Sequence, residues 1–189
     1  MERAALGRAV RERAYLEGDF VLRSGRRSRY YLDKYLFETT PEVLGPLGEL
    51  IAATVREHEP EAVRLAGPEL GAVALAAAAS LASGLPFLIV RKEPKDYGTA
   101  NRLEGAFEPG ERVCLVEDVV TSAGAAIEAV EALRKAGLEL GTAVAVVDRE
   151  EGGADALARI GVRLRPLFRA SELLAPPKSA ANRMVEPKR

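Results

Sequence analysis

Mostly apolar residues fall into short runs along much of the chain, with longer mixed stretches between them. The runs are Ala62–Ala66, Pro86–Val90, Val113–Val116, Ala143–Val147 and Val162–Leu167. A strand buried on both faces has no polar positions to alternate with, which is typical of parallel sheets covered by helices on both sides. The pattern therefore predicts an α/β protein with a parallel sheet flanked by helices.

The stretches between these runs predict the helices. A helix is expected over Pro41–His58, because proline favours the first helical turn. An alanine-rich helix should end near Ala82, a third helix should span Ala123–Ala136 with Gly137 closing it, and a short one should follow Gly153. Strands that alternate with helices in this order are the expected source of a parallel sheet.

The first 40 residues follow a different pattern. Charged and apolar residues alternate at helical spacing over residues 2–16, and Gly18-Asp19 is expected to end that helix. Two short segments rich in aromatic residues, Phe20–Arg23 and Ser28–Tyr35, predict strands joined by a tight polar connection. We call residues 1–40 the N-terminal hood.

Length and composition fit one domain. The chain has 189 residues, 48% of them hydrophobic, which suffices for a real core. We expect a single domain over 1–189, made of the hood, a ligand-binding core at about 41–170, and an irregular tail from Pro176.

Charge and rare residues narrow the chemistry. With 27 Lys and Arg against 28 Asp and Glu, the net charge is −1, which argues against nucleic acid as a partner. A single cysteine, Cys114, and a single histidine, His58, exclude a disulfide framework, a multi-cysteine zinc site and a Ser-His-Asp triad. We interpret Cys114 as a buried strand residue and His58 as a helix-end residue. Since the chain shows no apolar span or signal-peptide core, the prediction is a cytoplasmic protein without membrane contact.

The most specific motif follows the run Val113–Val116. Two acids, Glu117 and Asp118, come next, and a turn of small and hydroxyl residues then leads into a helix. The amides of such a turn and the helix dipole favour an anion, and hydroxyl side chains add donors. Carboxylates suit ribose hydroxyls rather than phosphate. A ribose 5-phosphate satisfies both requirements, although an ordinary strand-to-helix turn with a Thr/Ser cap is the alternative.

This motif resembles that of the type I phosphoribosyltransferases, which bind 5-phosphoribosyl-1-diphosphate (PRPP) together with Mg²⁺. The resemblance implies a parallel sheet with a variable hood, and a Mg²⁺ ion carried by PRPP with no direct protein ligand. It also implies that Glu117 and Asp118 contact the ribose, while the following turn holds the 5′-phosphate. The residues expected to bind PRPP are Arg91, Lys92, Lys95, Tyr97, Glu117, Asp118, Val119, Val120, Thr121, Ser122, Ala123, Gly124 and Ala125.

Three further segments are similar to the orotate phosphoribosyltransferase family in particular. They are the Ser-Gly element of residues 20–33, the polar stretch Arg91–Gly105 and the Asp148–Gly152 segment. The family resemblance implies a catalytic loop in the polar stretch, which we call the lid, with Lys95 as its catalytic residue. It also implies a homodimer with shared active sites.

The same resemblance assigns the base side of the site. It implies that Arg149 pairs with the orotate carboxylate and that Tyr31 and Thr121 also lie against orotate. It further places a diphosphate-binding turn at Gly67–Gly71, where Glu69 is an unexpected neighbour for a diphosphate.

Several alternatives stay open at this point. The lid is otherwise a solvated loop, and Arg149 is otherwise a surface ion pair with Glu150 or Glu151. Tyr97 stands where relatives carry histidine, which puts an acid–base role there in doubt. A phosphoribosyltransferase for a purine base and a PRPP-sensing regulatory protein are the two rival functions.

Overall fold

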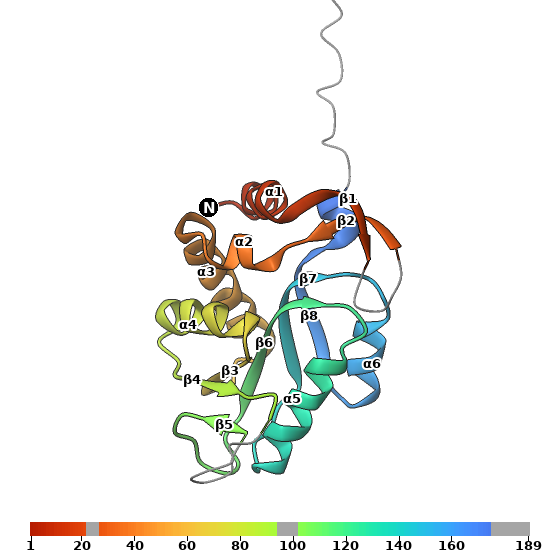
Figure 1. Ribbon diagram of the computed structural model, residues 1–189. Helices are drawn as coiled ribbons and strands as arrows, with labels where there is room; N and C mark the ends of the chain where they lie inside the picture. The colour runs from red at the N-terminus through yellow and green to blue at the C-terminus, as the bar shows by residue number, and fades with distance from the viewer. Residues whose placement is uncertain (22–26, 94–101, 175–189) are drawn as a thin grey trace, which may run out of the picture.

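The computed structural model describes residues 1–21, 27–93 and 102–174 (Figure 1). The elements are α1 (Arg3–Ala14), β1 (Tyr15–Val21), β2 (Arg27–Leu32), α2 (Lys34–Glu38), α3 (Pro41–His58), β3 (Arg64–Pro68), α4 (Gly71–Ser83), β4 (Phe87–Val90), β5 (Leu103–Glu104), β6 (Val113–Val120), α5 (Gly124–Lys135), β7 (Thr142–Asp148), α6 (Gly153–Arg159), β8 (Arg163–Arg169) and α7 (Ala170–Leu174).

A six-stranded sheet in the order β5-β4-β3-β6-β7-β8 forms the centre of the described chain. Five of its strands are parallel to one another, as the apolar runs predict. The predicted parallel sheet flanked by helices is confirmed, and the short edge strand β5 is added antiparallel to β4. An antiparallel neighbour needs no crossover helix, so β5 can pair with β4 without one.

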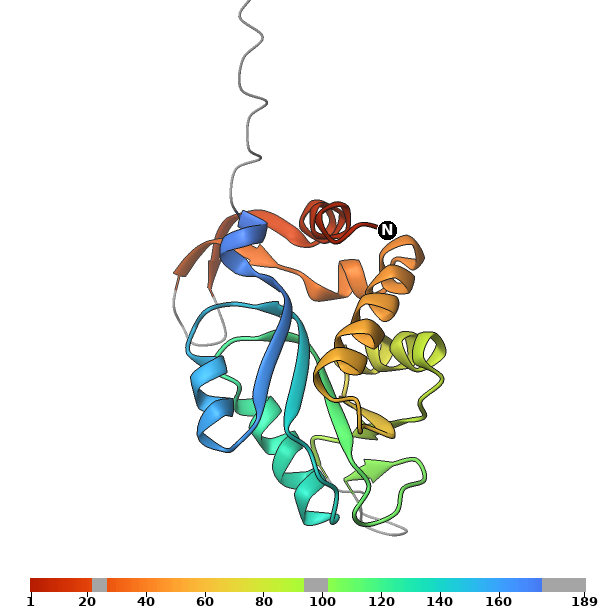
Figure 2. The ribbon, with the colours of Figure 1, turned by 180° about the vertical axis from the view of Figure 1, so that it is seen from behind.

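Helices cover both faces of this sheet, which explains why the runs of its central strands are mostly apolar. One apolar cluster joins α1, α3 and α4 to the side chains of Cys114 and Val116 on β6. The second cluster joins α5 and α6 to Val113 and Leu115, the alternate residues of the same strand. Figure 2 shows α3 and α4 on one side of the strands and α5 and α6 on the other. Consecutive residues of β6 are therefore buried in different cores.

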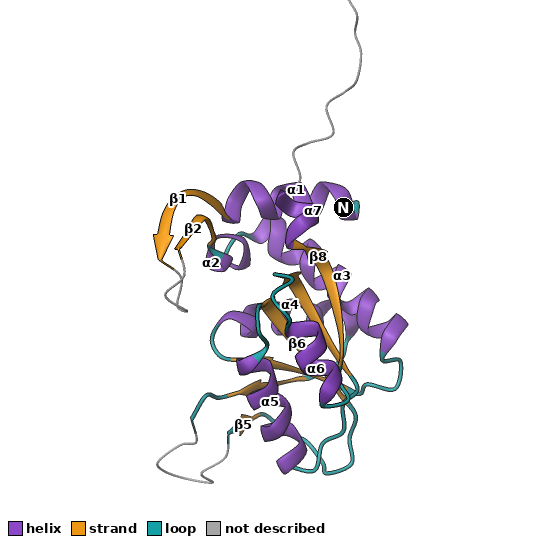
Figure 3. Ribbon diagram, turned by 90° about the vertical axis from the view of Figure 1, so that its right-hand side faces the viewer, coloured by secondary structure: helices purple, strands orange, loops and turns teal. Residues whose placement is uncertain are grey.

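The hood differs most from the prediction. The first helix ends at Ala14, and Gly18-Asp19 lies inside β1 rather than ending a helix. This strand pairs with β2 in antiparallel register from Tyr15 opposite Leu32, so a tertiary contact overrides the helical pattern. Figure 3 shows this hairpin beside α1 and α2 at one end of the molecule.

The second hood strand also ends earlier than expected. Residues Lys34–Glu38 form the short helix α2, because the Asp33 side chain accepts a hydrogen bond from the Tyr35 amide at 3.1 Å and caps that helix. The helix α7 was not anticipated. The predicted irregular tail from Pro176 lies outside the described residues.

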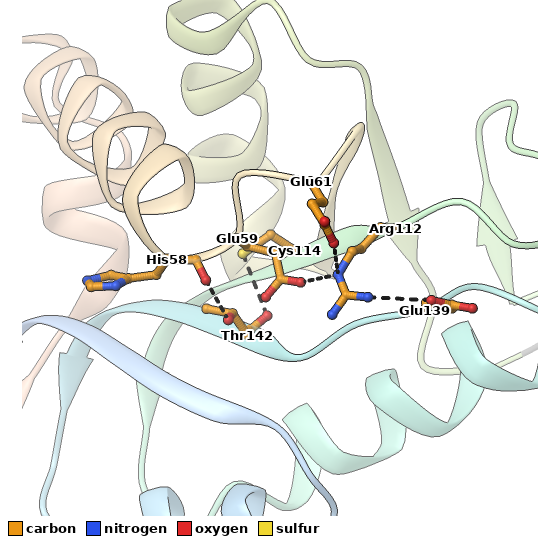
Figure 4. A network of polar contacts seen from close by, with 7 residues as sticks. All are labelled: His58, Glu59, Glu61, Arg112, Cys114, Glu139 and Thr142. Carbon is orange, nitrogen blue, oxygen red and sulfur yellow. Dashed lines mark hydrogen bonds and ion pairs between the residues drawn. The ribbon is translucent and has the colours of Figure 1, made fainter.

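At the amino end of the parallel strands, a polar network ties α3 to the sheet (Figure 4). The Arg112 guanidinium donates to the buried Glu59 carboxylate at 2.5 Å and also lies near Glu61 and Glu139. Cys114 is fully buried, and burial raises the pKa of its thiol. These contacts support a structural interpretation of Cys114. None of the helices in the described ranges is long and apolar enough to cross a membrane.

Candidate functional site

The carboxyl ends of the parallel strands border two adjoining cavities of about 650 and 210 Å³. Residues following β3, β4 and β6 line both of them. This edge is where open α/β sheets bind their ligands. Most of the predicted PRPP-binding residues meet here, and the larger cavity also includes Arg102. Those lining one or both cavities are Arg91, Lys92, Glu117, Asp118, Val119, Val120, Thr121, Ser122, Ala123, Gly124 and Ala125.

The turn after β6 has the geometry of an anion-binding loop. Thr121 and Ser122 are exposed, and Ala123 is a buried residue in left-handed backbone conformation at φ 65° and ψ 16°. A non-glycine residue rarely adopts this conformation, and such residues concentrate at functional sites. The turn leads directly into α5. The backbone amides of the first helical turn have no partner within the helix, and the first residues of α5, Gly124 and Ala125, line both cavities.

The acid pair lies deep in the smaller cavity rather than on its rim. Glu117 and Asp118 have only 7% and 5% of their surface exposed. Burial and the neighbouring Asp118 charge raise the pKa of Glu117 to about 8. Its Oε1 is buried and has no hydrogen-bond partner among the described residues. A buried acceptor without a partner is costly, so Glu117 is suited to receive a hydroxyl from a ligand.

Asp118 is held differently from Glu117. Its Oδ2 accepts a hydrogen bond from the Lys34 ammonium at 2.5 Å, and its Oδ1 accepts from the Val119 amide. Burial opposes the charge on Lys34, but the hydrogen bond and charge of Asp118 outweigh it, and the pKa of Lys34 lies above its usual range. Lys34 has no predicted role, because the aromatic-rich pattern of residues 28–35 places it near the end of a strand.

Glu38 is a third buried carboxyl near the acid pair. It lies on α2, one turn after Lys34, and 3% of its surface is exposed. Burial and the charge of Asp118 raise its pKa to about 8. The spacing of four residues between Lys34 and Glu38 is a helical signal that could have revealed both residues.

The start of the lid is tied to the turn after β3. The Glu69 side chain accepts a hydrogen bond from the Lys92 amide at 2.8 Å, which gives this acid a structural role beside a proposed diphosphate site. The Arg91 guanidinium lies 3.8 Å from the Glu104 carboxylate. The Arg91 amide donates to the Arg102 carbonyl at 2.7 Å, and the Arg102 guanidinium donates to the Arg91 carbonyl at 3.0 Å. The predicted catalytic Lys95 lies outside the described residues, as does Tyr97.

The residues predicted to bind orotate are less closely gathered. The Arg149 amide donates to the Val120 carbonyl at 2.8 Å, which places Arg149 beside the end of β6. Its side chain is 7% exposed and pairs with Glu151 at 3.1 Å, so an ion pair considered from the sequence does form, but it is buried. Tyr31 is 42% exposed on β2 and contacts the Phe20 ring. Of the three, only Thr121 lines the two cavities.

Known proteins resemble this chain in both sequence and structure, although no protein-family model matches it. A protein of Methanocella arvoryzae named orotate phosphoribosyltransferase is 51% identical over 157 residues, which are 83% of this chain and 88% of the relative. The crystal structure of orotate phosphoribosyltransferase from Aeropyrum pernix is 34% identical with a TM-score of 0.80, covering 89% of this chain and 96% of that one. The Mycobacterium tuberculosis enzyme in complex with Fe(III) dicitrate is 31% identical with a TM-score of 0.81, covering 90% and 98%.

A mostly parallel sheet flanked by helices, with an acid pair and a phosphate-type loop after one strand, defines a type I phosphoribosyltransferase fold. The sequence identity of 51% to the Methanocella arvoryzae protein, over most of both chains, then identifies the family within this fold. The chain belongs to the orotate phosphoribosyltransferase family. It is a pentosyltransferase of pyrimidine biosynthesis. Of the three functions considered from the sequence, this family membership favours the orotate enzyme over a purine-base enzyme and over a PRPP-sensing regulator.

Proposed function

We propose that the two adjoining cavities bind PRPP, with its ribose at the acid pair and its 5′-phosphate on the turn Thr121–Ala125. One observation carries this proposal. The same cavity is lined by Glu117, whose Oε1 is buried without a hydrogen-bond partner among the described residues, and by the loop that leads into α5. A ligand that fits both must bring hydroxyl donors and an anion close together. The ribose 5-phosphate end of PRPP has this combination.

The reaction needs little acid–base chemistry from the protein. Orotate N1 attacks C1′ of the ribose as the bond from C1′ to the diphosphate oxygen breaks, and the diphosphate leaves with the electron pair. The products are orotidine 5′-monophosphate and diphosphate. Because orotate is already an anion, the protein mainly holds the two substrates in line and stabilises the charge on the leaving group. Lys92, which lines both cavities, and Lys95 of the lid supply that positive charge.

We propose that Mg²⁺ enters with PRPP, bound through the oxygens of the substrate. Within residues 1–21, 27–93 and 102–174, no group of three or more His, Cys, Asp or Glu side chains could hold a metal ion. The acidic cavity nevertheless fits a cation carried by a polyphosphate, since hard divalent ions prefer oxygen ligands. Bound Mg²⁺ would neutralise charge on the departing diphosphate.

For orotate, we propose that Arg149 exchanges its present partner for the substrate. The planar guanidinium matches a carboxylate, and the Glu151 carboxylate now occupies that position at 3.1 Å. Thr121 and Tyr31 complete the orotate side in this proposal, with Tyr31 coming from the hood. Binding of orotate would then require the ion pair between Arg149 and Glu151 to open.

The roles of Arg149 and Lys95 are separated by steady-state kinetics. Arg149→Ala should raise the KM for orotate by about tenfold or more while leaving the KM for PRPP nearly unchanged, since a charged hydrogen bond to a carboxylate is lost. Lys95→Ala should lower kcat far more than it weakens PRPP binding, because its charge stabilises the leaving group. A normal KM for orotate in the first variant, or a normal kcat in the second, would contradict the assignment.

We base two further proposals, on assembly and on location, on the resemblance to the same family. We propose a homodimer in which the lid of one subunit reaches the site of the other, tested by sedimentation and by mixing two inactive variants. We also propose a cytoplasmic location. PRPP is highly charged and charged groups partition poorly into lipid, so the enzyme should work in the compartment where PRPP is made.

A further inference from the structure

Lys34 links the hood to the ribose end of the PRPP cavity. It lies at the start of α2, 84 residues before Asp118, yet its ammonium is 2.5 Å from Asp118 Oδ2. Both residues line the smaller cavity. The side chain of Lys34 is 32% exposed, whereas that of Asp118 is only 7% exposed. The pair is therefore a partly buried ion pair inside the site rather than a surface ion pair of little consequence.

Gly71 leaves the space in which this pair forms. A Cβ atom added at Gly71 would lie 2.7 Å from the Lys34 ammonium nitrogen and clash with Asp118 Oδ2. Gly71 is the first residue of α4, at the end of the turn proposed to bind diphosphate. Because Gly71 has no side chain, α4 can lie close to both α2 and the end of β6, with the Lys34 ammonium group between them.

The surroundings of this ammonium group carry an excess of acid. The titratable and charged groups around it are Asp33, Tyr35 and Glu38 from the hood, Glu117 and Asp118 from β6, and Lys92 after β4. Without Lys34, three buried carboxyls would lie close together at the place where a polyanionic substrate must bind. Like charges at this distance disfavour ionisation, and a protonated carboxyl accepts a ribose hydroxyl less well than a carboxylate does.

We propose that Lys34 is a positioning residue for PRPP: it fixes the Asp118 carboxylate and offsets its charge, so that the hood helix α2 sets the affinity of the ribose site. This inference rests on the proposed function of the cavity. Lys34 acts on the substrate through Asp118. The two carboxylate oxygens of Asp118 accept hydrogen bonds from the Lys34 ammonium and from the Val119 amide.

If Lys34 has this role, the affinity for PRPP should increase with rising pH. The pKa of Glu117 is raised to about 8 by burial and by Asp118, and Lys34 opposes this rise. Ionised Glu117 accepts a ribose hydroxyl better than the protonated acid does, so affinity should increase as pH rises through about 8. Loss of Lys34 removes the opposing charge, and the increase should move to higher pH.

This role is tested by calorimetry, in which PRPP is titrated into the protein in the presence of Mg²⁺, and by steady-state kinetics, both over pH 6.5–9.5. For Lys34→Met we expect about tenfold weaker PRPP binding near neutral pH, a pH profile displaced upward, and a much smaller change in kcat at saturating PRPP. Lys34→Arg keeps the charge and should restore most of the affinity. Lys135→Met removes an exposed charge at the far end of α5 and should bind PRPP normally.

Gly71→Ala provides a second approach that leaves Lys34 in place. The added methyl group displaces the pair, and its effect should be smaller in a Lys34→Met background than in the unaltered protein, because both changes displace the Asp118 carboxylate. Unchanged affinity and an unchanged pH profile in Lys34→Met would overturn the inference, as would full additivity of the two changes. Failure of the unaltered protein to bind PRPP would instead overturn the proposed function, and the inference with it.

Discussion

Replacement of Glu38 by glutamine should make the protein more stable at high pH. The Glu38 carboxyl is buried on α2, and burial together with the Asp118 charge raises its pKa from 4.5 to about 8. A carboxyl with a raised pKa in the folded state keeps its proton where the unfolded chain has lost it. Unfolding then releases a proton, so the free energy of unfolding decreases as pH rises from about 4.5 to about 8.

The size of this effect follows from the pKa difference. One pKa unit corresponds to about 1.4 kcal/mol, so a rise from 4.5 to about 8 corresponds to at most about 5 kcal/mol. The actual decrease is smaller, because the pKa of Glu117 is raised to the same range, so the two carboxyls titrate together, and because the charge of Lys34 lowers the pKa of Glu38. Glutamine has nearly the same shape and never ionises, so Glu38→Gln should lose the part of the pH dependence that Glu38 causes.

Urea denaturation at pH 5, 6, 7, 8 and 9 measures this effect. The stability of Glu38→Gln relative to the unaltered protein should increase steadily between pH 5 and pH 8 and then level off. The matched control is Glu111→Gln, since hydrogen bonds from Arg64 at 2.8 and 2.9 Å lower the pKa of Glu111. Its contribution is lost only at lower pH, so that curve should run parallel to the unaltered protein. Parallel curves for Glu38→Gln as well would refute a protonated Glu38.

Two further predictions concern opposite ends of the sheet. Arg112→Met leaves the buried Glu59 carboxylate without its 2.5 Å partner, which should lower the free energy of unfolding by about 1–3 kcal/mol in urea titrations and leave kcat nearly unchanged. Stability equal to that of the unaltered protein would contradict the importance of this pair. Gly153→Ala places a Cβ atom 2.5 Å from Val120 Cγ1 and closer still to the Thr121 carbonyl oxygen, which is too close for either contact. The phosphate loop must therefore shift, and the KM for PRPP should rise about tenfold or more. Gly45→Ala, whose Cβ meets open space, is the control, and equal KM values in the two variants would count against this prediction.

The core of the fold could be predicted because its signal is local. The apolar runs that became the central strands β3, β6 and β7 are buried on both faces, and burial on both faces removes most polar residues from the sequence itself. The acid pair and its phosphate loop are likewise contiguous, so their chemistry is visible in nine consecutive residues.

The hood could not be predicted in the same way, because its structure depends on distant contacts. Tyr15 continues a helical pattern in sequence but pairs with Leu32 in a strand. The role of Lys34 depends on Asp118, 84 residues further along, and on the absence of a side chain at Gly71. No local pattern records a contact of that kind. The spacing of Lys34 and Glu38 was the one available indication of a helix, and the aromatic run before it favoured a strand.

The most direct test of the proposed reaction is to mix the protein with PRPP, Mg²⁺ and orotate and to follow the ultraviolet absorbance of orotate. Parallel mixtures contain adenine, guanine or uracil in place of orotate. The predicted result is consumption of orotate with one diphosphate released per orotate, and no turnover of the other bases. Turnover of another base in place of orotate, or binding of PRPP without turnover of any base, would contradict the assignment.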